Sequence, residues 1–133
     1  MQLARQAGVI PIRQGKICLV TSRSGKRWII PKGCMEPGKN TGEIALQEAW
    51  EEAGLVGLLS QEPIGTYVYE KDSTMCHVIL FILEVTAELD NYPENGIRQR
   101  SWFQCDQALQ LLEDKGLRDI LIALGSKNII RLS

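Results

Sequence analysis

The sequence predicts a single α/β domain in which helices pack against a β-sheet. Three observations support this fold class. Short runs rich in Val and Ile alternate with segments of helical pattern, the 133 residues are enough for one hydrophobic core, and the chain has no internal repeat and no linker rich in Pro, Gly or Ser. We therefore expect residues 1–133 to form one domain.

The expected strands are short apolar runs separated by residues that are typical of turns. Two runs flank Arg13, Gln14 and Gly15, and a third run is stopped by Pro31. Residues 90–96 combine Asp, Asn, Pro and Gly and are expected to form a loop. In chain order, strands are expected at residues 7–12, 16–22, 28–30, 67–70, 77–86 and 98–104.

A helical pattern covers residues 41–53. Thr41 is the expected N-cap and Gly54 is the expected C-terminal stop. Two further helices are expected over residues 106–113 and 117–124. The residues of the first helix that are expected to pack on the sheet are Leu46, Ala49, Trp50 and Ala53.

Charge and hydropathy exclude several classes of partner. Fifteen Lys and Arg residues against sixteen Asp and Glu residues give a net charge of −1, so we expect no broad attraction to a nucleic-acid polymer or to an anionic membrane. No apolar run approaches the roughly 20 residues of a membrane-spanning helix, and the N-terminal residues do not resemble a signal peptide. We therefore expect a cytoplasmic protein. The oligomeric state stays open.

The cysteines are not arranged as metal ligands. They form no Cys-x-x-Cys pair, and the chain contains a single histidine, His77. We expect free thiols in a reducing compartment. The four cysteines are Cys18, Cys34, Cys76 and Cys105.

The helix at residues 41–53 carries a cluster of acidic side chains. Glu48, Glu51 and Glu52 fall within an arc of roughly 100° on its surface, a pattern that alone is typical of a solvated face. That face carries no Lys or Arg, and a glycine-containing loop with Lys32 leads into the helix. Binding of Mg²⁺ or Mn²⁺ would relieve the repulsion between the carboxylates. The glycine-containing loop and the helix N-terminus would bind phosphate. Together they favour metal-assisted attack on a phosphoanhydride.

The segment from Gly33 to Leu55 resembles the Nudix box, G-x5-E-x7-R-E-U-x-E-E-x-G-U, in which U is an aliphatic residue. The resemblance implies a Nudix-type α/β/α sandwich, with a mixed β-sheet flanked by helices. It also implies metal-dependent hydrolysis of a phosphoanhydride bond. By position in the box, Glu48, Glu51 and Glu52 would be the metal ligands.

Two positions of the box differ in this chain. Lys39 stands where the box has Glu, and Gln47 stands where it has Arg. Replacing both partners removes a charge pair together, which is less damaging than leaving one partner alone. The differences also support an alternative function, a Nudix-fold module that senses a nucleotide without cutting it. A purely structural domain is a third interpretation.

The residues around 22–37 and 98–103 are similar to diphosphoinositol polyphosphate phosphohydrolases, a subgroup that also hydrolyses diadenosine polyphosphates. This resemblance implies a small-molecule polyphosphate substrate, with a dinucleoside polyphosphate expected first, or a diphosphoinositol polyphosphate in a eukaryote. Arg grips phosphates through paired hydrogen bonds. The expected substrate-binding residues are Arg23, Arg27, Lys32, Gly33, Arg98 and Arg100, with Lys26 beside them.

A carboxylate must accept the proton of the attacking water. Within the acidic helix, Glu51 or Glu52 is the expected base. Outside it, Glu94 is the candidate, because related proteins often carry an extra Glu in the loop before the last strand; Glu70 is the next candidate.

Overall fold

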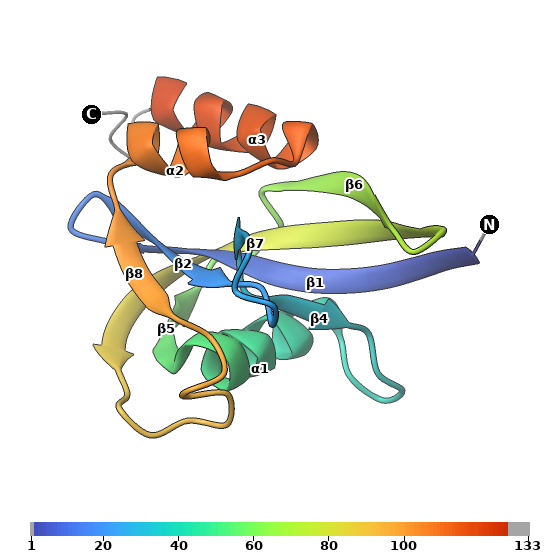
Figure 1. Cartoon of the computed structure of the whole chain (residues 1–133), viewed down its shortest axis with the longest axis horizontal. Helices are drawn as coiled ribbons and strands as arrows, with labels where there is room; N and C mark the ends of the chain where they lie inside the picture. The colour runs from blue at the N-terminus through green and yellow to red at the C-terminus, as the bar shows by residue number, and fades with distance from the viewer. Residues whose placement is uncertain (1, 128–133) are drawn as a thin grey trace.

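The computed structural model describes residues 2–127, which form an eight-stranded mixed sheet with helices on both faces (Figure 1). This arrangement confirms the predicted α/β class. Helix α1 covers one face, and α2 and α3 cover the other. In chain order, the elements are β1 Gln2–Arg13, β2 Lys16–Thr21, β3 Trp28–Ile29, β4 Lys32–Cys34, α1 Thr41–Ala53, β5 Leu55–Leu59, β6 Gly65–Lys71, β7 Thr74–Glu88, β8 Arg100–Phe103, α2 Cys105–Leu111 and α3 Lys115–Ser126.

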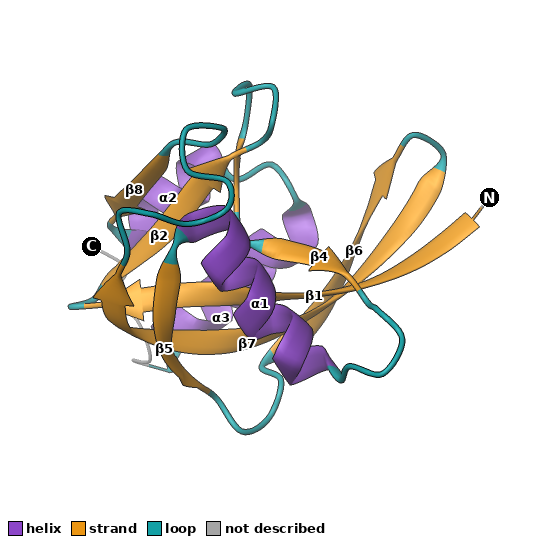
Figure 2. Cartoon of the chain, turned by 90° about the horizontal axis from the view of Figure 1, so that it is seen from below, coloured by secondary structure: helices purple, strands orange, loops and turns teal. Residues whose placement is uncertain are grey.

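The spine of the sheet is the long parallel pair of β1 and β7, which runs from Gln2 opposite Thr74 to Ile12 opposite Glu84. Parallel strands need a crossover connection, and the chain between them includes α1. The order along the sheet is β3-β2-β1-β7-β5, while β4 pairs with β1, β6 with β7 and β8 with β2. Figure 2 shows α1 lying across this sheet beside β4 and β5.

Alternating side chains of the strands fill two cores, one on each face of the sheet. In β1, Ile10 packs in the core beneath α2 and α3, whereas Val9 packs beneath α1. Leu117 and Leu121 of α3 close the first core, and Ile44 of α1 contributes to the second. The residues of both cores are buried, and the inner face of α1 is part of the second core.

The strand predictions differ from the structure mainly at the ends. The strands predicted at residues 7–12, 67–70 and 77–86 are longer, because ladder hydrogen bonds continue past the apolar residues. The strand predicted at 98–104 is shorter, because residues 98 and 99 belong to the preceding loop. Strands β4 and β5 were not predicted: β4 reads Lys-Gly-Cys and forms by pairing with β1, and β5 follows α1 after a single glycine.

Two predictions about α1 were wrong. The N-cap is Asn40 and not Thr41, because the Asn40 side chain accepts the Glu43 amide at 2.8 Å and the Glu43 carboxylate accepts the Asn40 amide at 3.0 Å. Leu46 and Trp50 do not pack on the sheet; they are 40% and 43% exposed. The buried stripe is rotated toward the residues Ile44, Ala45, Ala49, Glu52 and Ala53.

The other helix ends are close to the prediction. Gly54 ends α1 in the left-handed conformation with φ of 64°, as expected for a C-terminal stop.

The four cysteines are free thiols, as predicted. Within residues 2–127, no helix combines the length and the apolar character that crossing a membrane requires.

Candidate functional site

Helix α1 and strand β4 lie side by side, and this contact sets the position of Glu48. Gly33 in β4 pairs with Ala7 of β1 and faces the Glu48 side chain. A Cβ atom at Gly33 would lie only 2.3 Å from the Glu48 carboxyl carbon. The absent side chain of Gly33 therefore makes room for the carboxylate.

Glu52 is the most deeply buried of the three helix carboxylates, with 6% exposure. Its Oε1 accepts the Lys32 backbone amide at 3.0 Å, and its Oε2 accepts Nη2 of Arg98 at 3.2 Å. Burial raises the pKa of Glu52, while Arg98 opposes that rise. These bonds fix the end of α1 against β4 and against the loop that carries Arg98.

The Arg98 side chain hydrogen-bonds to several groups of the site and is 8% exposed. Besides Glu52, it donates from Nε to Glu94 at 3.0 Å and from Nη1 to the Thr21 carbonyl at 3.0 Å. The Glu94 backbone amide in turn donates to the Glu51 carbonyl at 2.9 Å. Of the three carboxylates on α1, Glu52 is thus paired with an arginine from the loop before β8.

The carboxylates around Glu48 crowd one another. Burial, followed by the charges of Glu52, Glu51 and Glu94, raises the pKa of Glu48 from 4.5 to about 8. A divalent cation with a preference for oxygen ligands would relieve this repulsion, so the donor set fits Mg²⁺ or Mn²⁺. Among residues 2–127, no group of three His, Cys, Asp or Glu side chains is arranged as it stands to hold a metal ion. Glu52 is turned toward Lys32 and Arg98, so ligation by all three helix carboxylates requires side chains to rotate.

The raised pKa of Glu48 gives the metal-free protein a distinct pH dependence. Between about pH 4.5 and 8, the folded protein holds a proton on Glu48 that the unfolded chain has released. The free energy of unfolding therefore contains a contribution that falls as the pH rises through this interval. We expect Glu48→Gln to remove that contribution, which urea denaturation at pH 5, 6, 7 and 8 in the presence of a chelator measures. Equal pH slopes in the two proteins would contradict this assignment.

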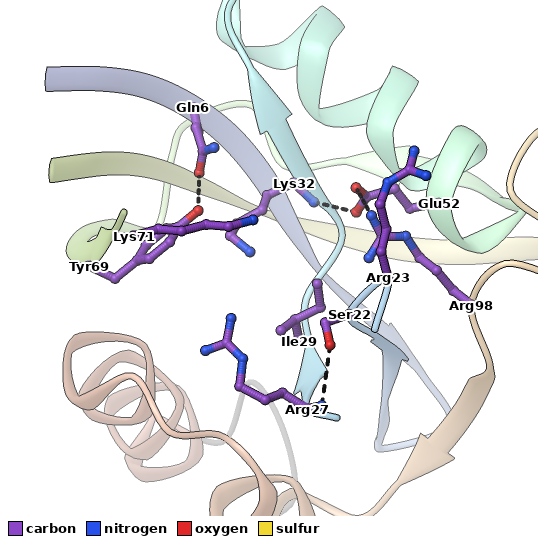
Figure 3. Close-up of a pocket in the computed structure, with 10 residues that line it drawn as sticks. All are labelled: Gln6, Ser22, Arg23, Arg27, Ile29, Lys32, Glu52, Tyr69, Lys71 and Arg98. Carbon is purple, nitrogen blue, oxygen red and sulfur yellow. Dashed lines mark hydrogen bonds and ion pairs between the residues drawn. The ribbon is translucent and has the colours of Figure 1, made fainter. Parts of the chain in front are cut away.

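A pocket of about 190 Å³ opens beside Glu52, and most of its charged residues are cationic (Figure 3). Figure 3 shows Arg23 and Arg98 next to Glu52, with Arg27 and Lys71 on the far side of the opening. The Tyr69 hydroxyl donates to Gln6 at 2.8 Å, and the Lys32 ammonium lies 5.1 Å from the Tyr69 ring centre. The lining residues are Gln6, Ser22, Arg23, Arg27, Ile29, Lys32, Glu52, Tyr69, Lys71 and Arg98.

The cations of the pocket differ in how firmly they are held. Arg23 is 69% exposed and 3.4 Å from Glu94, and Arg27 is 43% exposed and 3.8 Å from Glu113. Such exposed pairs are weak, so both guanidinium groups can turn to an anion. Lys32 is more buried than either arginine, and burial lowers its pKa although Glu52 partly opposes this shift.

The structure brings most of the sequence-predicted residues together. Four predicted substrate residues line the pocket, and Gly33 lies next to it against Glu48. Lys26 and Arg100 lie outside the lining. Glu70 lies exposed on β6, outside the lining. Sequence reasoning missed Gln6, Tyr69 and Lys71, because only the pairing of β6 with β7, and of β7 with β1, carries these residues to the pocket.

The two residues that differ from the box are bonded to each other. The Lys39 ammonium donates to the Gln47 amide oxygen, and Gln47 Nε2 donates to Glu36 Oε2 at 2.9 Å. The loop before α1 is thereby tied to the helix through one amide instead of an ion pair. A charged partner, Glu36, remains within the same cluster.

Comparison with known proteins gives one consistent family. The NUDIX domain model matches residues 2–124. Nudix hydrolase 12, mitochondrial, of Arabidopsis thaliana is 34% identical over 113 residues, which are 79% of this chain and 56% of that protein. Diphosphoinositol polyphosphate phosphohydrolase 3-beta of Homo sapiens is 34% identical over 105 residues, 76% of this chain and 62% of that protein. The chain thus spans little more than half the length of these relatives.

A solved structure of similar fold is a C. elegans Ap4A hydrolase binary complex. It superposes with a TM-score of 0.74 at 18% sequence identity, and the match covers 95% of this chain and 98% of that chain. At this identity the likeness concerns the fold alone.

Proposed function

Because the chain belongs to the Nudix family, we propose that it is a pyrophosphohydrolase that uses Mg²⁺ or Mn²⁺ to cleave a phosphoanhydride bond of a dinucleoside polyphosphate. One observation carries the proposal: Glu52 of α1, whose charge acts on Glu48, lines the same pocket as five Lys and Arg residues. A cation site next to an anion site is the arrangement that metal-assisted phosphoryl chemistry needs.

The residues of α1 would hold the metal. Glu48 and Glu51 offer the more accessible carboxylates, and Glu52 is the third donor once it turns from Arg98. A bound divalent ion supplies charge neutralisation on the phosphate oxygens and lowers the pKa of an attacking water. Nudix hydrolases generally use divalent metal ions, which agrees with this donor set.

The basic residues would bind and orient the polyphosphate. Arg23 and Arg27 are free to turn toward phosphate oxygens, and a guanidinium binds two oxygens of one phosphate at once. Lys32 and Lys71 add charge along the opening. A polyphosphate carries several negative charges, which match the several positive charges that line the pocket.

A carboxylate near the metal would take the proton from water. Glu94 is held at α1 by its own amide and by Arg98, with 14% of its side chain exposed. Glu51 and Glu52 are the alternatives on the helix itself. Glu94 is favoured, because it is not one of the helix carboxylates that would be engaged as metal ligands, and only its Oε1 is paired with Arg98 and Arg23.

The substrate that we propose for this chain is based on two similar proteins. One relative is a diphosphoinositol polyphosphate phosphohydrolase and one structural neighbour is an Ap4A hydrolase. We place the dinucleoside polyphosphate first, and the diphosphoinositol polyphosphate first if the source is a eukaryote. The free thiols fit a reducing compartment, and we place the protein in the cytoplasm.

Incubation with diadenosine tetraphosphate and with a diphosphoinositol polyphosphate tests the proposal. We expect products from one of them with Mg²⁺, and none when a chelator replaces the metal. Chromatography of the products identifies the bond that is cut.

A sensor module is the second candidate, because Lys39 and Gln47 replace two residues of the box. It predicts tight binding of the same compounds without any product. A purely structural domain predicts neither products nor thermal stabilisation by Mg²⁺ and ligand. Either result contradicts the hydrolase.

A further inference from the structure

Arg100 links the end of α1 to the start of the loop between β7 and β8. Its Nη1 donates to the Ala53 carbonyl at 2.8 Å and to the Leu89 carbonyl at 2.9 Å, and its Nη2 lies 3.7 Å from Glu88 Oε2. The last carbonyls of a helix have no partner within the helix, so a donor at this point fixes the helix end. The side chain is 17% exposed and all these contacts are within the protein.

The same loop packs against the C-cap of α1. Leu89 donates its amide to the Gly54 carbonyl at 2.8 Å, and the Tyr92 ring covers Gly54 so closely that a Cβ there would lie 2.3 Å from the ring. The Arg100 guanidinium lies 5.1 Å from the centre of the Tyr92 ring. Tyr92 is thereby held between the helix end and Arg100.

Two residues beyond Tyr92 the loop reaches Glu94, whose amide donates to the Glu51 carbonyl at 2.9 Å. Asn95 closes the turn through its side chain, which donates to the Asp90 carbonyl at 2.7 Å. In Figure 1 this loop runs from β7 past α1 to β8. The Glu94 carboxylate also accepts from Nε of Arg98 at 3.0 Å, so its position depends both on Arg98 and on the docking of the loop, to which Arg100 contributes at Leu89.

We propose that Arg100 is a positioning residue, which docks the loop of residues 89–98 on the end of α1 and so, together with Arg98, sets where the Glu94 carboxylate lies beside Glu48 and Glu52. The effect on turnover rests on the proposed hydrolase function; the effect on the loop does not. This role differs from the substrate contact that the sequence predicted for Arg100. Its donors face Ala53 and Leu89, and it lies outside the cationic pocket.

The activity test compares Arg100→Met with Arg118→Met, which removes an exposed arginine of α3. We expect Arg100→Met to lower kcat by roughly 10-fold with little change in KM, because displacement of a reacting group by a fraction of an ångström is enough for such a loss. Arg118→Met should match the wild type. Arg100→Lys, which keeps the charge but cannot donate as a planar fork, should lie between them.

A double variant separates positioning from an independent role. If Arg100 acts through Glu94, Arg100→Met should lower kcat no further in a protein that already carries Glu94→Gln. Multiplied losses in the double variant would overturn the proposal. So would a rise in KM with kcat unchanged, which is the signature of a substrate contact.

A readout without turnover keeps the two proposals distinct. Hydrogen exchange at the Leu89 and Glu94 amides reports whether the loop is docked. We expect Arg100→Met to speed exchange at both amides, with Arg118→Met unchanged. Unchanged exchange would overturn the positioning role. If the wild type cuts none of the substrates, the proposed function fails, and the exchange measurement still decides the role of Arg100.

Discussion

Replacing Glu52 with Gln is expected to abolish turnover and to leave the fold intact. The amide oxygen of Gln can still accept the Lys32 backbone amide, the bond that ties α1 to β4. The negative charge is lost, and the neutral amide oxygen is a much weaker ligand for a divalent cation than a carboxylate. We expect kcat to fall by about 10²- to 10⁴-fold, the range typical for the loss of a charged group that acts in the chemical step.

Stability should change little in Glu52→Gln, for two opposing reasons. The variant removes one half of the pair with Arg98, but it also removes a buried charge whose pKa burial has raised. Arg98 keeps Glu94 and the Thr21 carbonyl as partners. Thermal denaturation followed by circular dichroism measures this expectation.

Glu62→Gln is the matched control, because Glu62 is exposed in the connection between β5 and β6 and the substitution is chemically the same. It should retain wild-type kcat. Activity of Glu52→Gln at saturating Mg²⁺ comparable to that of this control would remove Glu52 from the mechanism. Loss of the folded signal in Glu52→Gln would show instead that the fold depends on the Glu52 charge, through Lys32 or Arg98.

Sequence patterns predict the parts of the fold that depend on local chemistry. The change from strand-like runs to the helical pattern locates α1, and Gly54 marks its end, because a left-handed residue there favours glycine. Strand β4 could not be predicted, since Lys32, Gly33 and Cys34 have no strand preference of their own. It exists because the backbone of β1 offers a partner, which is a tertiary fact.

The site also contains residues whose position the sequence pattern predicts and residues whose position it does not. The spacing of Glu48, Glu51 and Glu52 places them together because all three lie on one helix. Arg98 reaches Glu52 from 46 residues away in the chain, and no spacing rule predicts that contact. Lys71 enters the pocket only through the pairing of β6 with β7.

Arg100 shows most directly what residue type and sequence position cannot predict. The sequence places it two residues from Arg98 near the final strand, and both were predicted to bind substrate. Arg98 lines the pocket, whereas the Arg100 guanidinium contacts the end of α1 and the loop. Residue type and position cannot separate these two arginines, because the difference lies in which backbone carbonyls are within reach.

Substitution of Gly33 by Ala is expected to damage activity far more than stability. The new methyl group would lie 2.3 Å from the Glu48 carboxyl carbon, so that carboxylate must move. The atoms it meets are the far end of a flexible side chain, which can rotate away at small cost. We expect a loss of about 10- to 100-fold in Mg²⁺ affinity or in kcat, the effect typical of a change that reorients a metal ligand.

Gly57→Ala is the contrasting variant, because its Cβ would meet backbone. That atom would lie 2.1 Å from the Glu84 carbonyl oxygen, at the irregular step of the β5–β7 pairing. Backbone in a ladder cannot rotate away, so the strain should lower the free energy of unfolding by about 1–3 kcal/mol. The Mg²⁺ requirement of the folded fraction should stay unchanged, because Gly57 lies outside the site.

Measuring Mg²⁺ titrations of activity together with urea denaturation for both variants separates the two effects. Gly33→Ala should shift the Mg²⁺ titration and hold the denaturation midpoint, while Gly57→Ala should do the opposite. If Gly33→Ala leaves the Mg²⁺ titration unchanged, the Glu48 carboxylate is not held where the metal is needed. If both variants shift only the denaturation midpoint, the contact between β4 and α1 stabilises the fold without setting the ligand geometry.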